Sequence, residues 1–354
     1  MEARHHVRLS VAAAKDLGAR ILGAMGAPAD IAAGVARHLA LSDASGHASH
    51  GLSLLPVYAG DLDAGRIVVG SRGRWIQETG AALVIDGERG FGAPVANMAL
   101  ARAVDEARRS GVCLLAVRNV HHLGRIGAFA EEAAEAGLAS LHFCNVVGRA
   151  PVVVPAGGRE ARFVTNPLAV GIPRPGRFPV VLDIATSGIA LNKARVAHLR
   201  GEAVEPGYLV DAEGHGTTDP GVLFREPRGA LLPFGLHKGS GLAVVGELLA
   251  GALSGGRTIA PHNERDGSTL NNMLSILIAP DHLAGAAWRE EAEAMIGYLH
   301  DCPPVDPDEP VLVPGEPEAI ARQEAEAQGI AYDAATWGTL TRLAEERGVA
   351  LPPL

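Results

Sequence analysis

A change of hydrophobic period near residue 73 constrains the fold more than any other feature of this sequence. Residues 9–42 repeat apolar side chains every three to four positions behind Ser10, and so predict two amphipathic helices. From residue 73 onward, short strand-like runs alternate with helical segments, and residues 284–354 return to a helical period. The pattern predicts a mixed α/β (α+β) fold whose helical ends flank a sheet.

Glycine and proline mark the turns of the central part. The strands are predicted at 82–86, 113–117, 138–143, 178–183 and 274–278, and the helices at 93–110, 126–136, 240–254, 284–300 and 334–347. A chain of 354 residues is too long for one simple core. We expect an N-terminal helical part (1–72), a central part with the sheet (73–283) and a C-terminal helical part (284–354).

Composition argues against several classes of partner. The net charge is −9 with histidine neutral, and no long Lys/Arg run is present, so we expect neither nucleic acid nor an anionic membrane surface. No apolar run approaches the roughly 20 residues that span a bilayer. Cys113, Cys144 and Cys302 are far apart and odd in number, which disfavours a disulfide framework and predicts a reducing cytoplasm.

The common nucleotide and hydrolase motifs are missing. No G-x-G-x-x-G lies between a predicted strand and helix, because Gly239-Ser240-Gly241 lacks the third glycine. The sequence also lacks a P-loop, a G-x-S-x-G elbow and H-E-x-x-H. Any dinucleotide site must therefore be built in another way.

Two histidine pairs carry the strongest chemical signal. His47 and His50 lie between Gly46 and Gly51 in a polar loop. Imidazole gives and takes protons near neutral pH, so the pair is a candidate for acid/base chemistry. The alternative is a loop at a helix end whose histidines bond to the backbone.

The second pair, His121 and His122, lies in the segment 119–127 between a predicted strand and a predicted helix. Arg125 follows, and its planar fork suits a carboxylate or phosphate. A strand-to-helix turn with an incidental histidine pair is the alternative.

Two further segments could meet a phosphate or a ribose. Lys238 lies between His237 and Gly239 at a predicted helix start, which suits a pyrophosphate unless it is only a glycine-punctuated helix start. Asp183 ends a predicted strand and could bond to a ribose, although a helix cap is the better explanation from the residues alone.

These segments, in this order, resemble the malate/L-lactate dehydrogenase family that has no Rossmann domain, and most closely its hydroxycarboxylate dehydrogenase B type. The resemblance runs from about residue 17 to 337. It rests on the motifs at 46–51, 121–127, 165–167, 182–187, 216–220, 237–239, 270–273 and 314–316. It implies a non-Rossmann cofactor domain on a large mixed sheet, helices from both termini packed together, and a homodimer.

The resemblance also implies a cofactor site, with NAD expected and NADP as the alternative. The implied contacts are His50, Gly124, Arg125, Ile126, Val181, Leu182, Asp183, Ile184, Ala185, His237, Lys238, Asn271, Val313, Pro314, Gly315 and Glu316. It implies an acid/base histidine at His122, with His50 as the second candidate.

One departure from the family concerns the substrate. Many members carry Arg three residues after the 46–51 segment, where it holds a carboxylate, and here that position is Leu54. We expect Arg125 to take over this contact, with His47 as a further substrate contact. The predicted reaction interconverts a 2-oxo acid and a 2-hydroxycarboxylic acid by hydride transfer.

Two other functions remain open from the sequence. His47, His50, His121 and His122 could serve a metal hydrolase, although zinc usually takes three or more converging ligands. A relative that binds nucleotide without catalysis is the other alternative.

Overall fold

A computed structural model describes residues 7–353 of the chain. Residues 1–6 of the predicted N-terminal part (1–72) and residue 354 of the predicted C-terminal part (284–354) lie outside the described residues. The N-terminal helices are α1 (Val11–Ala24), α2 (Ala29–Ala44) and α3 (Leu55–Asp63), joined by the short 3₁₀ turns η1 (Ala48–His50) and η2 (Leu52–Leu54). The two helices predicted within 9–42 are α1 and α2.

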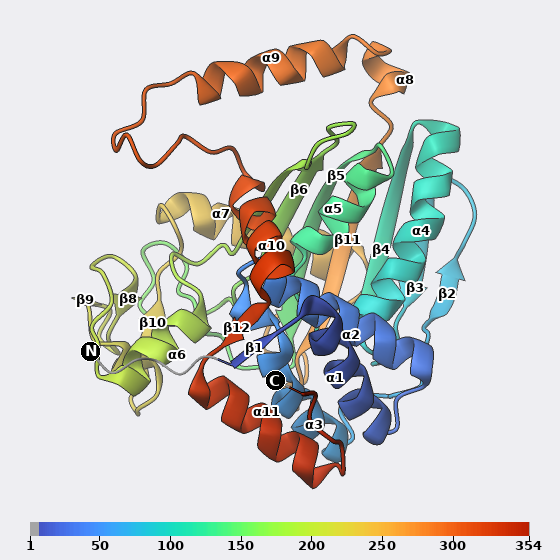
Figure 1. The fold of residues 1–354 in the computed structure, drawn as a ribbon. Helices are drawn as coiled ribbons and strands as arrows, with labels where there is room; N and C mark the ends of the chain where they lie inside the picture. The colour runs from blue at the N-terminus through green and yellow to red at the C-terminus, as the bar shows by residue number, and fades with distance from the viewer. Residues whose placement is uncertain (1–6, 354) are drawn as a thin grey trace.

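A mixed sheet of seven strands forms the centre, as the family resemblance implied (Figure 1). The strands at 74–77 and 168–172 were not among the five predicted from the sequence. Its order is β2-β3-β4-β11-β5-β6-β7. Only β3 and β4 are parallel, and every other neighbouring pair is antiparallel. The strands are β2 (Arg74–Gln77), β3 (Ala82–Asp86), β4 (Val112–His121), β5 (Ala139–Val147), β6 (Leu168–Ile172), β7 (Val180–Ile184) and β11 (Leu270–Ile278).

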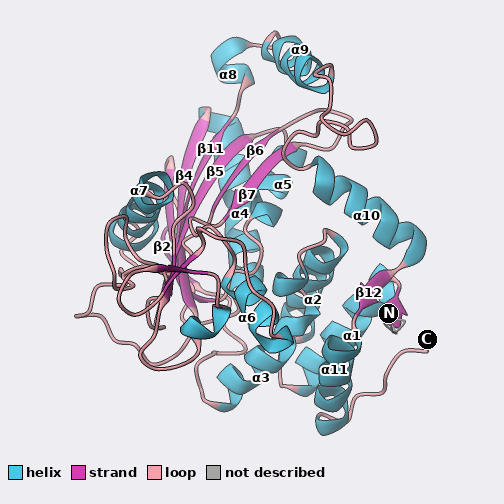
Figure 2. Cartoon of the chain, turned by 90° about the vertical axis from the view of Figure 1, so that its left-hand side faces the viewer, coloured by secondary structure: helices cyan, strands magenta, loops and turns pink. Residues whose placement is uncertain are grey.

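Helices cover both faces of this sheet. Helices α4 (Gly92–Ser110) and α5 (Gly127–Glu135) lie on one face, while α7 (His237–Gly246) and its π-helical continuation η4 (Glu247–Leu253) lie on the other (Figure 2). Alanines such as Ala99, Ala103 and Ala130 are fully buried, which lets α4 and α5 approach the strands closely.

The two ends of the chain share one hydrophobic core. Leu17, Ile21 and Leu39 from the N-terminal helices pack with Tyr332 and Leu340 from the C-terminal segment. That segment comprises α10 (Glu316–Gln328), β12 (Ile330–Tyr332) and α11 (Ala334–Glu346), and β12 pairs with β1 (Val7–Leu9). Helices α8 (Asp281–Ala284) and α9 (Trp288–His300) instead lie beyond the opposite end of the sheet (Figures 1 and 2).

A smaller unit follows β7. It holds α6 (Leu191–Arg200), η3 (Pro220–Leu223) and a three-stranded sheet of β8 (Leu209–Val210), β9 (Gly216–Thr217) and β10 (Ala230–Leu231). Its separate core includes Val153 and Leu231. The sequence did not predict this unit because its strands are only two residues long. The three-part division of the chain stays a prediction.

Candidate active site

A bulge near the end of β4 aims the second histidine pair. Two residues of β4, Arg118 and Asn119, lie opposite the single residue Asn272 of β11. Asn119 takes a positive φ of 52°, and its backbone N–H donates to Asn272 Oδ1 over 2.8 Å. Bulges of this kind bend a strand and redirect its side chains. His121 and His122 follow directly after this one.

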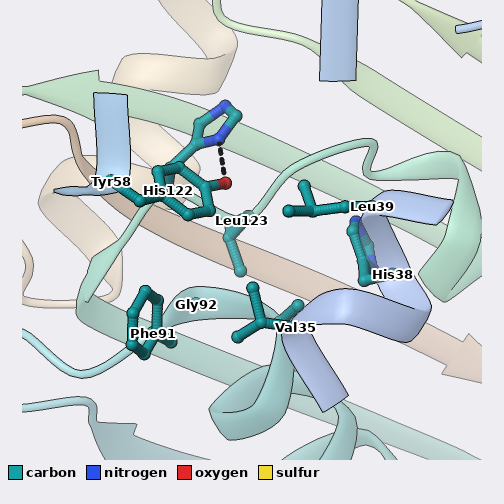
Figure 3. A pocket seen from close by; sticks show the side chains of 9 residues that line it. Val35, His38, Leu39, Tyr58, Phe91, Gly92, His122 and Leu123 are labelled. Carbon is teal, nitrogen blue, oxygen red and sulfur yellow. Dashed lines mark hydrogen bonds between the residues drawn. The ribbon is translucent and has the colours of Figure 1, made fainter. Parts of the chain in front are cut away.

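The two histidines of the pair have different surroundings. His121 is fully buried, and its Nε2 lies 2.9 Å from Asp61 Oδ2. Asp61 also accepts from Arg66 over 3.0 Å, so His121 ties β4 to α3. His122 instead lines a cavity, with its Nδ1 2.9 Å from the hydroxyl oxygen of Tyr58 (Figure 3). Of the pair, His122 is therefore the one placed for chemistry.

The structure brings the two predicted histidine pairs together. The rings of His50 and His122 are stacked, with centroids 5.8 Å apart and an interplanar angle of 24°. His50 Nδ1 lies 2.9 Å from Ser49 Oγ. Residues from η1 and from the end of β4, far apart in sequence, thus form one pair of imidazoles.

A small cavity adjoins His122. It is lined by Val35, His38, Leu39, Tyr58, Phe91, Gly92, Ala93, His122 and Leu123, and its volume is about 10 Å³. This is close to the least room that one water molecule needs. Gly92 keeps the backbone close, because a Cβ there would lie 2.3 Å from the His121 carbonyl oxygen.

Two residues of this cavity were missed in the sequence. His38 lies on α2 and is 5% exposed, and its Nε2 has no hydrogen-bond partner within residues 7–353. A Cβ on Gly124 would lie 2.4 Å from that nitrogen, so the glycine makes room for the ring. Tyr58 lies on α3. Neither belongs to a motif, and only the packing of helices against β4 brings them to His122.

Burial sets the protonation state of these imidazoles. It lowers the pKa of His122 well below the ordinary value of 6.5, and the neighbouring His50 lowers it further. Burial also lowers the pKa of His50 to about 4 and that of His38 to about 3. All three rings are therefore neutral at pH 7, and a neutral imidazole can accept a proton.

Arg125 is held in a buried cluster of charges. It is 3% exposed, and its Nη2 lies 2.8 Å from Glu131 Oε2, which also contacts Arg322. The N–H bonds of Arg125 do not point at that oxygen, so no described acceptor satisfies them. The other predicted substrate contact, His47, has its Nε2 3.1 Å from Glu318 Oε1. The substrate roles of Arg125 and His47 stay predictions.

Three of the predicted cofactor segments meet beside this cluster. Gly127 N–H donates to Asp183 Oδ2 over 2.9 Å and so joins the 124–127 turn to β7. Val181 N–H donates to the Pro314 carbonyl over 2.9 Å. Gly315 takes a φ of 97°, and a Cβ there would lie 2.9 Å from Val181 N. Segments 124–127, 181–185 and 313–316 therefore lie side by side.

The predicted segment at the start of α7 adjoins the continuation of β7. Phe234 N–H donates to the Thr186 carbonyl over 3.1 Å, and a Cβ on Gly239 would lie 2.4 Å from that oxygen. His237 and Lys238 are exposed. A cation at a helix start beside glycine suits an anionic ligand.

The side-chain amide of Asn271 bonds to backbone groups of the protein. Its Oδ1 accepts from Leu123 N–H over 2.8 Å, and its Nδ2 donates to the Asn145 carbonyl over 3.1 Å. Because the oxygen and the nitrogen of this amide both bond to backbone groups, Asn271 fixes the turn after His122. A direct cofactor contact by Asn271 stays a prediction.

Within residues 7–353, no three His, Cys, Asp or Glu side chains converge so that they could hold a metal ion. Within the same residues, no helix has the length and apolar character needed to cross a membrane.

Comparison with known proteins identifies the relatives of this chain. A sequence profile of the malate/L-lactate dehydrogenase family matches residues 9–341. An L-lactate dehydrogenase from Cupriavidus necator is 46% identical over 98% of this chain and 99% of its own. Hydroxycarboxylate dehydrogenase B from Escherichia coli is 41% identical over 89% of this chain and 87% of its own.

Solved structures share the fold. A Δ1-piperideine-2-carboxylate reductase from Pseudomonas syringae superposes with a TM-score of 0.85 and 32% identity, covering 96% of this chain and 100% of its own. A dehydrogenase from Sinorhizobium meliloti gives a TM-score of 0.85 and 34% identity over 96% and 98% of the two chains. Together with the profile match over nearly the whole chain, these similarities establish that the protein is an oxidoreductase of the malate/L-lactate dehydrogenase family.

Proposed function

We propose that this protein interconverts a 2-oxo acid and a 2-hydroxycarboxylic acid with NAD as cofactor, NADP being the alternative. The observation that carries the proposal is the half-buried His122, whose ring is bonded to Tyr58 and stacked on His50. The family assignment and the converging cofactor segments support it, and they favour a dehydrogenase over a metal hydrolase.

The residues present fit a dinucleotide. Arg125 offers buried N–H groups without aligned acceptors, and Lys238 offers an exposed cation. Glycines at 124, 127 and 315 let these segments pack closely on their neighbours, because a Cβ at each position would collide with another part of the protein. We expect the segments 124–126, 181–185 and 313–316, together with His50, His237 and Lys238, to hold the cofactor.

His122 performs the proton transfer in this scheme. When bound, the nicotinamide ring supplies hydride chemistry at the substrate carbon. In the oxidative direction, neutral His122 accepts the hydroxyl proton at Nε2 as C2 of the substrate loses its hydride. In the reductive direction, protonated His122 returns that proton to the carbonyl oxygen. Proton transfer of this kind contributes about 10²–10⁴-fold to the rate.

Tyr58 fixes the tautomer that this role requires. For Nε2 to accept a proton, Nδ1 of neutral His122 must carry hydrogen and donate it to the Tyr58 oxygen, which lies 2.9 Å away. Burial raises the pKa of Tyr58, so its hydroxyl stays protonated. The ring of His50 stacks on that of His122, and we expect it to orient the nicotinamide or to relay the proton.

The test is a steady-state screen of 2-oxo acids with NADH and with NADPH. The wild-type protein should oxidise one reduced cofactor in the presence of a 2-oxo acid. His122→Asn should lower kcat by about 10²-fold or more, while its Kd for the reduced cofactor, measured by fluorescence, stays unchanged. A wild type that binds neither cofactor, or a His122→Asn variant with normal turnover, would sink the proposal.

We also propose a homodimer. The helix α7 and its continuation η4 expose Val244, Leu248 and Leu253, with Leu248 56% and Leu253 70% exposed. At the end of the sheet, α9 exposes Met295 and Tyr298, the latter at 74%. Apolar patches of this kind on a folded protein mark interaction surfaces, and a second copy of the chain is the commonest partner.

A further inference from the structure

The proposed reaction places a substrate carboxylate beside the carbonyl group on which His122 acts. A cation near His122 would bind this carboxylate and orient the substrate. Arg66 and Arg89, which lie near the site, are held by Asp61 and Asp266 over 3.0 and 2.7 Å. Arg149 and Arg125 remain, and their surroundings differ.

The sheet register brings Arg149 to the edge where His122 lies. Strands β4 and β5 both run antiparallel to β11, which lies between them, so they run in the same direction and end at the same edge. Leu270 of β11 pairs with His121 on one side and with Val147 on the other. His122 is one residue beyond this row and Arg149 is two residues beyond it. Two strand spacings separate them by about 10 Å, a distance that an arginine side chain and a small acid can bridge.

The turn before Arg149 is fixed. Gly148 takes a φ of 86°, and its carbonyl accepts from Gly267 N–H over 2.9 Å. A Cβ on Gly148 would lie 2.5 Å from the Ser268 carbonyl oxygen, so the backbone at Gly148 packs closely against the segment 267–268. The base of the Arg149 side chain therefore has a defined position relative to β4.

The side chain of Arg149 is available to a ligand. It is exposed, and no residue within 7–353 forms a hydrogen bond or an ion pair with it. Its positive charge also acts on the histidines of the site. Burial is the main cause of the lowered pKa of His121 and of His122, and the charge of Arg149 lowers both pKa values further.

Arg125 has different neighbours from Arg149. It contributes to the lowered pKa of His50 and His38, and its guanidinium lies beside Glu131 and Asp183. The 124–127 turn that carries it bonds to Asp183 of β7, so that Arg125 lies among the predicted cofactor segments. This position suits a cofactor contact better than a contact beside the acid/base nitrogen of His122.

We infer that Arg149, rather than Arg125, binds the carboxylate of the 2-oxo acid. The inference rests on the proposed function. It assigns the cation to the turn that follows β5, at a position outside every motif that carries the family resemblance. A substrate held between Arg149 and His122 would lie across the end of β11.

The test compares the best 2-oxo acid from the screen with its uncharged primary amide. In Arg149→Met, kcat/KM for the acid should fall roughly 10- to 100-fold, the effect of losing a charge-assisted hydrogen bond. For the amide, kcat/KM should stay within about twofold, and so should the Kd for the reduced cofactor. Arg149→Lys should lie between the two because it keeps the charge and loses the fork. Arg342→Met removes an exposed arginine from α11 and should change nothing.

Three results would overturn the inference. The first is an Arg149→Met variant that keeps the wild-type preference for acid over amide. The second is an equal loss for both substrates, which would indicate a structural role for Arg149. The third is an Arg125→Met variant that loses the preference for acid over amide while Arg149→Met keeps it. A wild type inert toward all 2-oxo acids would instead overturn the proposed function, so the two failures are distinguishable.

Discussion

The hydroxyl oxygen of Tyr58 lies 2.9 Å from Nδ1 of His122, and this hydrogen bond links α3 to the end of β4. Tyr58 is 3% exposed, and its ring also packs against Phe91 and edge-on against His121. The phenol thus contributes packing through its ring and orientation through its oxygen. Phenylalanine would remove only the second contribution.

Tyr58→Phe should therefore lower kcat while leaving the fold intact. We expect a loss of about 5- to 10-fold, the effect of one neutral hydrogen bond that orients a reacting group. Steady-state kinetics would measure it, and thermal unfolding would confirm the fold. Tyr298→Phe, on the exposed face of α9, is the matched control. An unchanged kcat in Tyr58→Phe would show that the bond does not orient His122 for the reaction.

The pH dependence of the reaction should reflect the lowered pKa of His122. Oxidation needs neutral His122, and burial keeps the ring neutral well below pH 6.5. The kcat/KM for oxidation should therefore stay level as the pH falls from 8 through 6.5, and decline only at lower pH. Reduction needs the protonated ring, so its kcat/KM should rise as the pH falls over the same range. An oxidation profile that drops with a midpoint near 6.5 would contradict this assignment.

Gly51 should be intolerant of a side chain. A Cβ there would lie 1.6 Å from Asp43 Oδ1, and the same carboxylate accepts from Leu52 N–H and from the hydroxyl of Tyr332 over 2.8 and 2.9 Å. Gly51→Ala must displace this carboxylate and both bonds. We expect it to lower the free energy of unfolding by about 1–3 kcal/mol, measured by urea denaturation.

Gly60→Ala is the control for that substitution. Gly60 lies on α3, and a Cβ there would meet no atom within 4 Å. Alanine favours the helix by up to about 1 kcal/mol over glycine, so this variant should be as stable as the wild type or more stable. A Gly51→Ala variant that matched it would show that the loop around Asp43 adapts without cost.

A charge on η4 should dissociate the proposed homodimer. Leu253→Glu places a carboxylate at a side chain that is 70% exposed in the single chain and would be buried against a second copy. Light scattering should then give the mass of one chain, against two for the wild type. Leu199→Glu, on α6 and 72% exposed, is the control and should leave the mass unchanged. A wild type that is monomeric at micromolar concentration would refute the homodimer.

The sequence predicted long elements better than short ones. The strand predicted at 82–86 is β3, and the helix predicted at 93–110 is α4 with one more residue at its start. The helix predicted at 284–300 was wrong over 285–287, because the chain breaks into α8 and α9 at Gly285, whose φ is 57°. Helix α10, which begins at Glu316, was not among the predicted helices.

The sequence by itself determined which local elements form and where reactive side chains cluster along the chain. Hydrophobic period and turn residues act over a few positions, and the motifs named His50 and His122 without any structure. Only the tertiary structure decided that His121 bonds to Asp61 while His122 faces the cavity, and that Tyr58 and His38 join it. It also placed Arg149 at the same sheet edge. The physical reason is that these contacts depend on strand register and on which buried faces meet, and both arise from packing between segments distant in the chain.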